Sequence, residues 1–208
     1  MKVLLVNGSP HQKGCIYTAL GEVAGALEKQ GVEAEIFQLG NDPISGCIGC
    51  GVCQKTLKCF RKDIVNEFLD KASDTDGFVF GSPVHFASAS GMLTSFMDRV
   101  FFTNIASKLL EYKPAAAVVS CRRGGATATF EQINKYFTMS NMPIVSSQYW
   151  NMVHGYTPED VRQDLEGMQT MRTLGNNMAW LLKSIEAGMA AGVALPENEA
   201  PVYTNFIR

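Results

Sequence analysis

The chain has 208 residues, of which 46% are hydrophobic, and 18 basic against 20 acidic residues leave a formal net charge of −2. This length supports a buried core, and we expect residues 1–208 to form a single domain. The balanced charge excludes the strongly basic surface of proteins that bind nucleic acids or anionic membranes. The first apolar run is too short for a signal peptide and no 18-residue apolar stretch occurs, so we expect a cytoplasmic protein whose partners are small molecules or further subunits.

Segments typical of strands and helices alternate along the chain. The opening run KVLLV ends at Asn7 and Gly8, which is typical of a strand buried on both faces of a parallel sheet. The segment 18–31 carries apolar residues on one helical face and stops at Gly31. The other predicted strands are 32–39, 76–83, 115–121 and 142–150, and the other predicted helices are 63–73, 91–102, 129–140 and 158–190.

This alternation predicts an α/β fold, in which a doubly wound sheet of five parallel strands lies between two layers of helices. A dinucleotide-binding fold would require G-x-G-x-x-G after the first strand and an acidic residue at the end of the second, and neither is present. The loop GSPHQKG offers Ser9, Lys13 and Gly14 before a helix, which suits a terminal phosphate. We therefore expect the flavodoxin-like fold, with strand order 2-1-3-4-5 and residues 155–208 as a helical C-terminal extension.

Three loops should meet where the ligand of such a sheet binds, beyond the carboxyl ends of the strands. The loop after the third strand has the rigid Pro83 followed by the flat side chains of His85 and Phe86, and the next loop has two arginines before Gly124 and Gly125. Each loop alone is also compatible with a simple strand-ending turn. Their convergence at one crevice favours a site for a mononucleotide, a phosphate joined to a flat heterocycle.

Two segments, GSPHQKG after the first strand and GSPVHFASASGMLTSFMDR after the third, resemble the NADPH-dependent FMN reductase branch of the flavodoxin-like superfamily, over roughly residues 1–155. The resemblance implies an enzyme that binds FMN and uses NAD(P)H to reduce a flavin, a quinone or another small acceptor. The FMN phosphate would contact Ser9, His11, Gly14, Cys15, Ile16 and Tyr17. The isoalloxazine ring would lie against Pro83, Val84, His85, Phe86, Ala87 and Ser88, and its pyrimidine side would lie against Ser120, Cys121, Arg122, Arg123, Gly124 and Gly125.

One position departs from that family, since its members usually carry Thr or Ser where this chain has Ile16. The missing hydroxyl removes a hydrogen bond to a charged group, which contributes about 1.5–3 kcal/mol. Backbone donors and Thr18 would compensate, so we expect weaker FMN binding, and a degenerate flavin fold that acts only as a binding module is a further hypothesis. Because the flavin supplies the redox chemistry, no catalytic acid or base is assigned, and His85 is expected at the pocket edge.

Four cysteines, Cys47, Cys50, Cys53 and Cys59, fall within thirteen residues at C-x2-C-x2-C-x5-C spacing. In a reducing compartment such clusters indicate metal or redox chemistry more often than disulfides. A tight turn containing two glycines can direct three thiolates toward one cluster, and a fourth cysteine can complete the site. The arrangement resembles the compact motif of iron-sulfur flavoproteins, which implies an alternative function, an electron carrier with FMN and a [4Fe-4S] cluster. Structural or redox-active thiols and a zinc site remain open.

Two further expectations concern placement. Because the cysteine segment follows the second strand, we expect it next to the predicted flavin edge, whereas Cys15 and Cys121 are expected to be packing groups within the flavin loops. The C-terminal segment carries apolar residues at helical spacing, which usually form core. They could also form a subunit interface, and the resemblance implies a homodimer or homotetramer. These residues are Leu165, Met168, Met171, Met178, Leu181 and Leu182.

Overall fold

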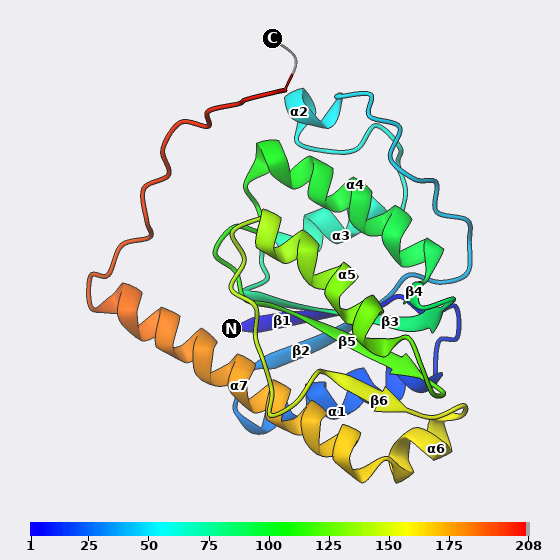
Figure 1. Cartoon of the computed structure of the whole chain (residues 1–208). Coiled ribbons are helices and arrows are strands. Elements are labelled where there is room, and N and C mark those ends of the chain that lie inside the picture. Colours follow the sequence, from blue (N-terminus) through cyan, green and yellow to red (C-terminus); the bar gives the residue numbers. More distant parts are fainter. Residues whose placement is uncertain (207–208) are drawn as a thin grey trace.

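A computed structural model describes residues 1–206 and has one central sheet (Figure 1). Five parallel strands lie in the order β2-β1-β3-β5-β6, and a short β4 pairs antiparallel with the end of β3. Counted without β4, this is the predicted order 2-1-3-4-5, so the flavodoxin-like fold is confirmed. The strands are β1 (Lys2–Asn7), β2 (Glu33–Gln38), β3 (Gly77–His85), β4 (Ser88–Ala89), β5 (Ala115–Cys121) and β6 (Met152–His154).

Helices cover both faces of the sheet, as a parallel sheet requires (Figure 1). Asp63 and Ser90 cap the N-termini of α3 and α4, each accepting a hydrogen bond from a first-turn N–H group. One face carries α1 (Cys15–Lys29), α6 (Pro158–Gln163) and α7 (Leu165–Ala190); the other carries α3 (Ile64–Ala72), α4 (Gly91–Ser107) and α5 (Ala126–Met139), with the short α2 (Cys53–Thr56) against α4.

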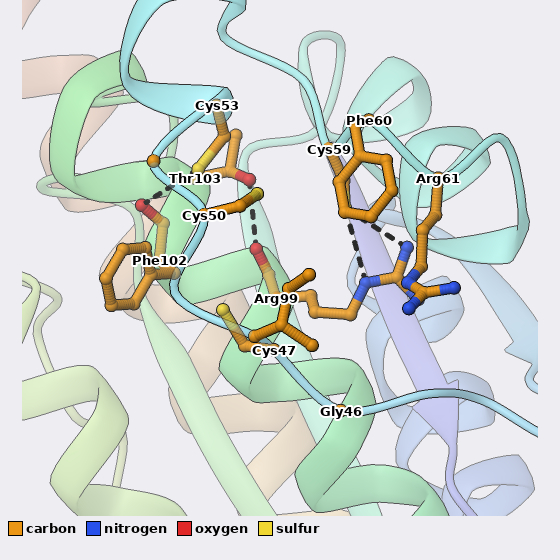
Figure 2. Close-up of a pocket in the computed structure, with 12 residues that line it drawn as sticks. Gly46, Cys47, Cys50, Cys53, Cys59, Phe60, Arg61, Arg99, Phe102 and Thr103 are labelled. Carbon is orange, nitrogen blue, oxygen red and sulfur yellow. Dashed lines mark hydrogen bonds between the residues drawn. The ribbon is translucent and has the colours of Figure 1, made fainter.

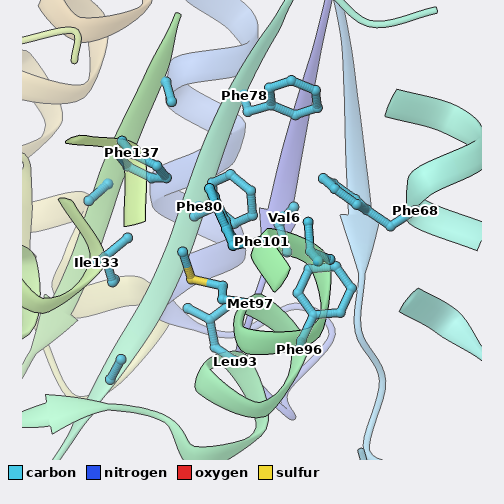
Figure 3. Close-up of a cluster of buried hydrophobic side chains, with 14 of the residues drawn as sticks. Val6, Phe68, Phe78, Phe80, Leu93, Phe96, Met97, Phe101, Ile133 and Phe137 are labelled. Atoms are coloured by element: carbon cyan, nitrogen blue, oxygen red, sulfur yellow. The ribbon is translucent and has the colours of Figure 1, made fainter. Parts of the chain in front are cut away.

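Two apolar cores lie on opposite faces of the sheet because successive strand side chains point in opposite directions. Along β1, Leu4 and Val6 belong to the core beneath α3, α4 and α5, while Val3 and Leu5 belong to the core beneath α1 and α7. The first core is rich in phenylalanine rings, whose centroids lie 5.2 to 6.5 Å apart (Figure 3). These rings pack against α4, and the cysteine segment packs on the outer side of the same helix.

The C-terminal extension packs along α1 rather than standing apart from the domain. A Cβ atom at Gly175 would lie 2.7 Å from both the Cβ of Ala26 and the carbonyl oxygen of Val23, so the two helices approach closely because position 175 has no side chain. The predicted methionine stripe is confirmed as core, except that Leu165 is 76% exposed. Its buried members are Met168, Met171, Met178 and Leu182.

The strand predicted at 142–150 is wrong. That segment makes one isolated bridge, between Ile144 and Ala115, and the strand itself is β6 at Met152–His154. The Ser147 hydroxyl bonds the carbonyl of Tyr149 and the side chain of Asn151, each at 2.7 Å. These local side-chain hydrogen bonds compete with hydrogen bonds to the neighbouring strand, so pairing with β5 in register starts only at Met152. Over residues 1–206, no helix is long and apolar enough to cross a membrane.

Candidate functional site

The carboxyl ends of β1, β3 and β5 lie side by side, so the three predicted loops meet at one edge of the sheet. The Gly8 N–H donates to the carbonyl of Gly81 at 2.9 Å, and the Ser90 hydroxyl donates to the carbonyl of Gly8 at 2.8 Å. Pro83 pairs in register with Ser120. The three loops therefore start at one edge of the sheet, and hydrogen bonds join the first two.

The first loop delivers the N-terminus of α1. Gly14 precedes the helix, and within residues 1–206 no side chain caps it, so the first-turn N–H groups lack the intrahelical partners and the side-chain cap that would satisfy them. Residues 11–15 line one wall of an open groove of about 460 Å³, and residues 156–158 line the other. Backbone donors at the positive end of a 15-residue helix fit a bound phosphate in both charge and geometry.

Two of the predicted phosphate residues have their side chains turned inward. Ser9 is buried, and its hydroxyl accepts the N–H of His11 at 3.2 Å, so it shapes the loop. Ile16 is buried against Gly81, which leaves only its backbone N–H for a ligand. The Thr18 hydroxyl donates to the carbonyl of Gly14 at 3.2 Å, so it is engaged within its own helix. Only backbone N–H donors could therefore replace the hydroxyl that Ile16 lacks. The side chains of His11 and Tyr17 are exposed.

The second loop is a tight β3–β4 hairpin that displays Phe86. Phe86 and Ala87 adopt φ of 52° and 60°, a left-handed conformation that non-glycine residues seldom adopt and that costs about 1–3 kcal/mol each. The side-chain oxygen of Gln132 fixes the hairpin by accepting from the Ser88 hydroxyl at 2.8 Å and the Ala89 N–H at 2.9 Å. Phe86 is fully exposed, beside the exposed His85 and the half-buried Pro83 and Val84. Such a strained apolar platform suits a flat ring.

The third loop contacts this hairpin through Gly125. Its φ is 89°, and a Cβ atom there would lie 2.7 Å from the Cα of Ala87, so only glycine fits. Arg122, Arg123 and Gly124 are exposed, whereas Ser120 and Cys121 are buried at the end of β5.

Neither cysteine of these loops has the features of a reactive thiol. Burial raises the pKa of Cys121, whose sulfur lies 3.4 Å from Nδ1 of His154. Burial also raises the pKa of Cys15, which Ser120 partly offsets by a hydrogen bond. Both thiols therefore stay protonated at neutral pH, which agrees with the expectation that they are packing groups.

Sequence reasoning missed the wall formed by Tyr156, Thr157 and Pro158. Thr157 and Asp160 form a capping box, in which the Asp160 carboxylate accepts the N–H groups of Tyr156 and Thr157, both at 3.0 Å. These bonds lower the pKa of Asp160 and hold the wall opposite Gly14. The sequence T-P-E-D, a hydroxyl residue three positions before an acid, was the signal that could have revealed it.

The cysteine segment does not border these loops, so that expectation is wrong. Gly46 approaches Ser95 near the start of α4. Further along, the carbonyl of Phe102 accepts a hydrogen bond from Nε2 of Gln54 at 2.9 Å and lies 3.9 Å from the sulfur of Cys53. Phe102 is twelve residues beyond Ser90, which is about 18 Å along a helix. The segment runs along α4 away from the flavin edge because it packs on the helix rather than on the strand ends.

The four clustered cysteines line one small cavity against α4 (Figure 2). Its volume is about 20 Å³, room for about one water molecule. All four are free thiols, and among residues 1–206 no three His, Cys, Asp or Glu side chains are close enough together to hold a metal ion. Cys53 is buried and Cys59 half-buried, whereas Cys47 and Cys50 are exposed, and Cys50 lies between two glycines with positive φ. The four thiols fit a thiolate-bound metal in chemical kind, and Cys47 and Cys50 would have to move inward to bring their sulfur atoms around one point.

Arg99, which the sequence analysis did not single out, is buried beside Cys59. Its side chain is 2% exposed and pairs with both carboxylate oxygens of Asp63, at 2.7 and 2.8 Å. Burial lowers the pKa of Arg99, but hydrogen bonds to Asp63 and Cys59 outweigh that effect and keep the pKa above its ordinary value. A permanent positive charge therefore lies next to the cysteine cavity. Its only sequence signal was the tripeptide MDR in an otherwise apolar helical segment.

The family described as NADPH-dependent FMN reductase matches residues 1–157, three quarters of the chain. The chain belongs to this family. As a member of it, the protein is an oxidoreductase of the flavin-binding type, and the resemblance read from the loops after β1 and β3 is confirmed.

Relatives and solved structures agree with that placement. An iron-sulfur flavoprotein of Methanocaldococcus jannaschii is 33% identical over 192 residues, which cover 89% of this chain and all of that protein. An iron-sulfur flavoprotein of Archaeoglobus fulgidus is 34% identical over 128 residues, covering 61% of this chain and 63% of that protein. Among solved structures, the flavoenzyme NAD(P)H:(acceptor) oxidoreductase FerB of Paracoccus denitrificans has a TM-score of 0.66 at 14% identity, over 88% of this chain and 97% of that one. At 14% identity, this similarity shows the fold of the chain and nothing further.

Proposed function

We propose that the protein uses NAD(P)H to reduce a small acceptor, such as a flavin or a quinone, with FMN bound at the carboxyl edge of the sheet. The observation that carries this proposal is the meeting of three loops at one edge of the sheet, where the N-terminus of α1 has no side-chain cap among the described residues and the β3–β4 hairpin exposes Phe86. When bound there, FMN would supply the two-electron redox chemistry between the nicotinamide and the acceptor.

The chain's own residues place the cofactor. The N–H groups of Cys15, Ile16 and Tyr17 would receive the phosphate, with His11 beside them at the groove. The β3–β4 hairpin would support one face of the ring, and the loop of Arg122 and Arg123 would border its pyrimidine oxygens with charged donors. None of these groups needs to transfer a proton, so the proposal assigns positioning and no acid or base.

The phosphate assignment predicts a large difference between two flavins. Titration of flavin-free protein with FMN, followed by quenching of flavin fluorescence, should give one site per chain. Riboflavin, which lacks the phosphate, should bind at least about tenfold more weakly, since each hydrogen bond to a charged group contributes about 1.5–3 kcal/mol. Equal affinities for the two flavins would contradict a phosphate at the start of α1, and absence of FMN binding would contradict the function.

A second candidate, an electron carrier with an iron-sulfur cluster, is supported by the cavity that all four clustered cysteines line and by the similarity of the chain to two iron-sulfur flavoproteins. Cys47, Cys50, Cys53 and Cys59 would hold the cluster, which supplies one-electron chemistry when bound. Protein purified without oxygen should then contain about four iron and four sulfide per chain and absorb broadly near ~400 nm in addition to the flavin bands. Flavin bands without iron would restrict the function to the FMN-dependent enzyme.

A further inference from the structure

The buried guanidinium of Arg99 has a role that the flavin edge does not explain. Its Nε and Nη2 atoms lie 3.3 and 3.2 Å from the sulfur of Cys59 (Figure 2). Its other contacts are the Asp63 carboxylate and the carbonyl oxygen of Ser45, at 3.4 Å from Nη1. Among the described residues, the groups that the Arg99 guanidinium contacts thus belong to the cysteine segment or to residues just before and after it.

Two N–H groups of Arg99 point at the sulfur of Cys59, which is the arrangement in which arginine binds an electron-rich acceptor. Arginine presents two parallel N–H groups to anionic acceptors, whereas a neutral thiol sulfur is a weak acceptor. Burial of a cation is costly unless anions compensate it, and the Asp63 carboxylate is itself 35% exposed. Four thiolates in the adjacent cavity would supply further negative charge, which matches a guanidinium held there.

Cys59 is held by hydrogen bonds from two helices. The side chain of Asn66, in α3, accepts the N–H of Cys59 at 3.0 Å and donates to its carbonyl at 2.9 Å. Its backbone is therefore fixed by α3 and its sulfur by α4. By contrast, Cys47 and Cys50 are exposed. One side of the cavity is preformed, and Arg99 is the charged part of that side.

We propose that Arg99 is a positioning residue for an iron-sulfur cluster, orienting Cys59 through two N–H donors and raising the reduction potential of the cluster. This inference rests on the second candidate function above. Reduction adds negative charge to the site, and hydrogen bonds to a ligand sulfur together with a nearby cation stabilise the more negative form.

The test is a redox titration of the cluster-loaded, full-length protein, followed by electron paramagnetic resonance. Arg99→Met removes both donors and the charge, and at a fixed ambient potential it should lower the ratio of reduced to oxidised cluster about tenfold, which is 59 mV for one electron. Arg99→Lys keeps the charge without the fork and should give a smaller change in the same direction. Asp63→Asn keeps an N-cap but removes the competing carboxylate, so it should shift the potential upward.

Arg61→Gln is the matched control. Arg61 lines the same cavity, but its guanidinium lies over the Phe60 ring, 5.1 Å from the centroid, and among the described residues it donates to no sulfur. This variant should change the ratio less than Arg99→Lys does. A general effect of surface charge would shift the Arg61 and Arg99 variants equally, and that result would overturn the proposed role.

The outcomes also separate the two proposals. If the wild-type protein binds no iron and sulfide, the electron-carrier function fails, and the role of Arg99 fails with it. If it loads a cluster whose potential is unchanged in Arg99→Met, only the role of Arg99 is overturned. If Arg99→Met does not fold, the opposite shifts expected for Arg99→Lys and Asp63→Asn decide the matter, and shifts in one direction for both would contradict the proposal.

Discussion

Gly125 is the residue at which the requirement for glycine is sharpest. Its φ of 89° and the 2.7 Å approach to the Cα of Ala87 leave no room for a side chain. Gly125→Ala should lower the free energy of unfolding by about 1–3 kcal/mol, measured by urea denaturation, because the loop must take a strained conformation or move off the hairpin.

Gly124→Ala is the control for this substitution. Gly124 has no heavy atom within 4 Å of an added Cβ and no positive φ. Its unfolding free energy should stay within about 0.5 kcal/mol of wild type, as is usual for surface substitutions. Equal effects at positions 124 and 125 would show that the contact between the third loop and the hairpin is not what Gly125 provides.

At the residue scale, the sequence predicted the kinds of residues at the site better than their roles. Glycine and proline after strands located the loops, because those residues mark turns in any context. The inward side chain of Ile16 could not be predicted, since either face of a helix start can be buried, and that of Ser9 depends on its hydrogen bond within the loop. Arg99 was missed for a similar reason: its partners, Cys59 and Asp63, lie 40 and 36 positions away in the chain.

Among the elements, Glu35 of β2 joins β1 to α3. Its carboxylate contacts Lys2 at 2.6 Å and Lys71 at 2.8 Å, and these hydrogen bonds lower its pKa below the ordinary value of 4.5. A carboxylate with a lowered pKa stabilises the fold above its unfolded-state pKa, and that stabilisation is lost as the pH falls through the folded-state pKa. Part of the stability of the protein should therefore disappear below about pH 4.5.

Glu35→Gln should remove that part of the pH dependence, leaving a smaller fall in unfolding free energy between about pH 7 and about pH 3. Glu33→Gln is the comparison, because Glu33 is 68% exposed and lies 3.5 Å from Lys2. Exposed pairs of this kind contribute little, so this variant should follow the wild-type pH profile. If both variants gave the same profile, the bridge through Glu35 would not be the cause.

The hydrophobic pattern of the sequence predicted a strand correctly wherever both faces of that strand are buried. Continuous apolar runs identified β1, β3 and β5, because a central parallel strand is buried on both faces. The edge strand β6 was misplaced by several residues, since only three residues pair and the bonds of Ser147 determine where pairing starts. The β3–β4 hairpin was read as a loop, because Phe86 and Ala87 are unusual residues for left-handed turn positions.

On the scale of the whole molecule, α7 completes the core over α1. The family match ends at residue 157, yet Met171, Leu174 and Met178 are fully buried beyond it. A chain ending at residue 157 should therefore lose its cooperative urea transition, because the apolar face of α1 would be exposed.

Removal of residues 193–208 is the matched truncation. The described part of that segment, 193–206, is exposed throughout. This truncation should retain a single cooperative transition with a midpoint close to wild type. A cooperative transition in the chain ending at 157 would show that α7 is an addition to a self-sufficient domain.

The central claim concerns a redox protein whose flavin is reduced by a nicotinamide. The most direct measurement is the absorbance of the FMN-loaded protein after anaerobic mixing with NADPH and, separately, with NADH. At least one of them should bleach the flavin band at ~450 nm, and a quinone added afterwards should restore it. FMN that binds but stays oxidised with both nicotinamides would show that the protein is not a nicotinamide-dependent flavin enzyme.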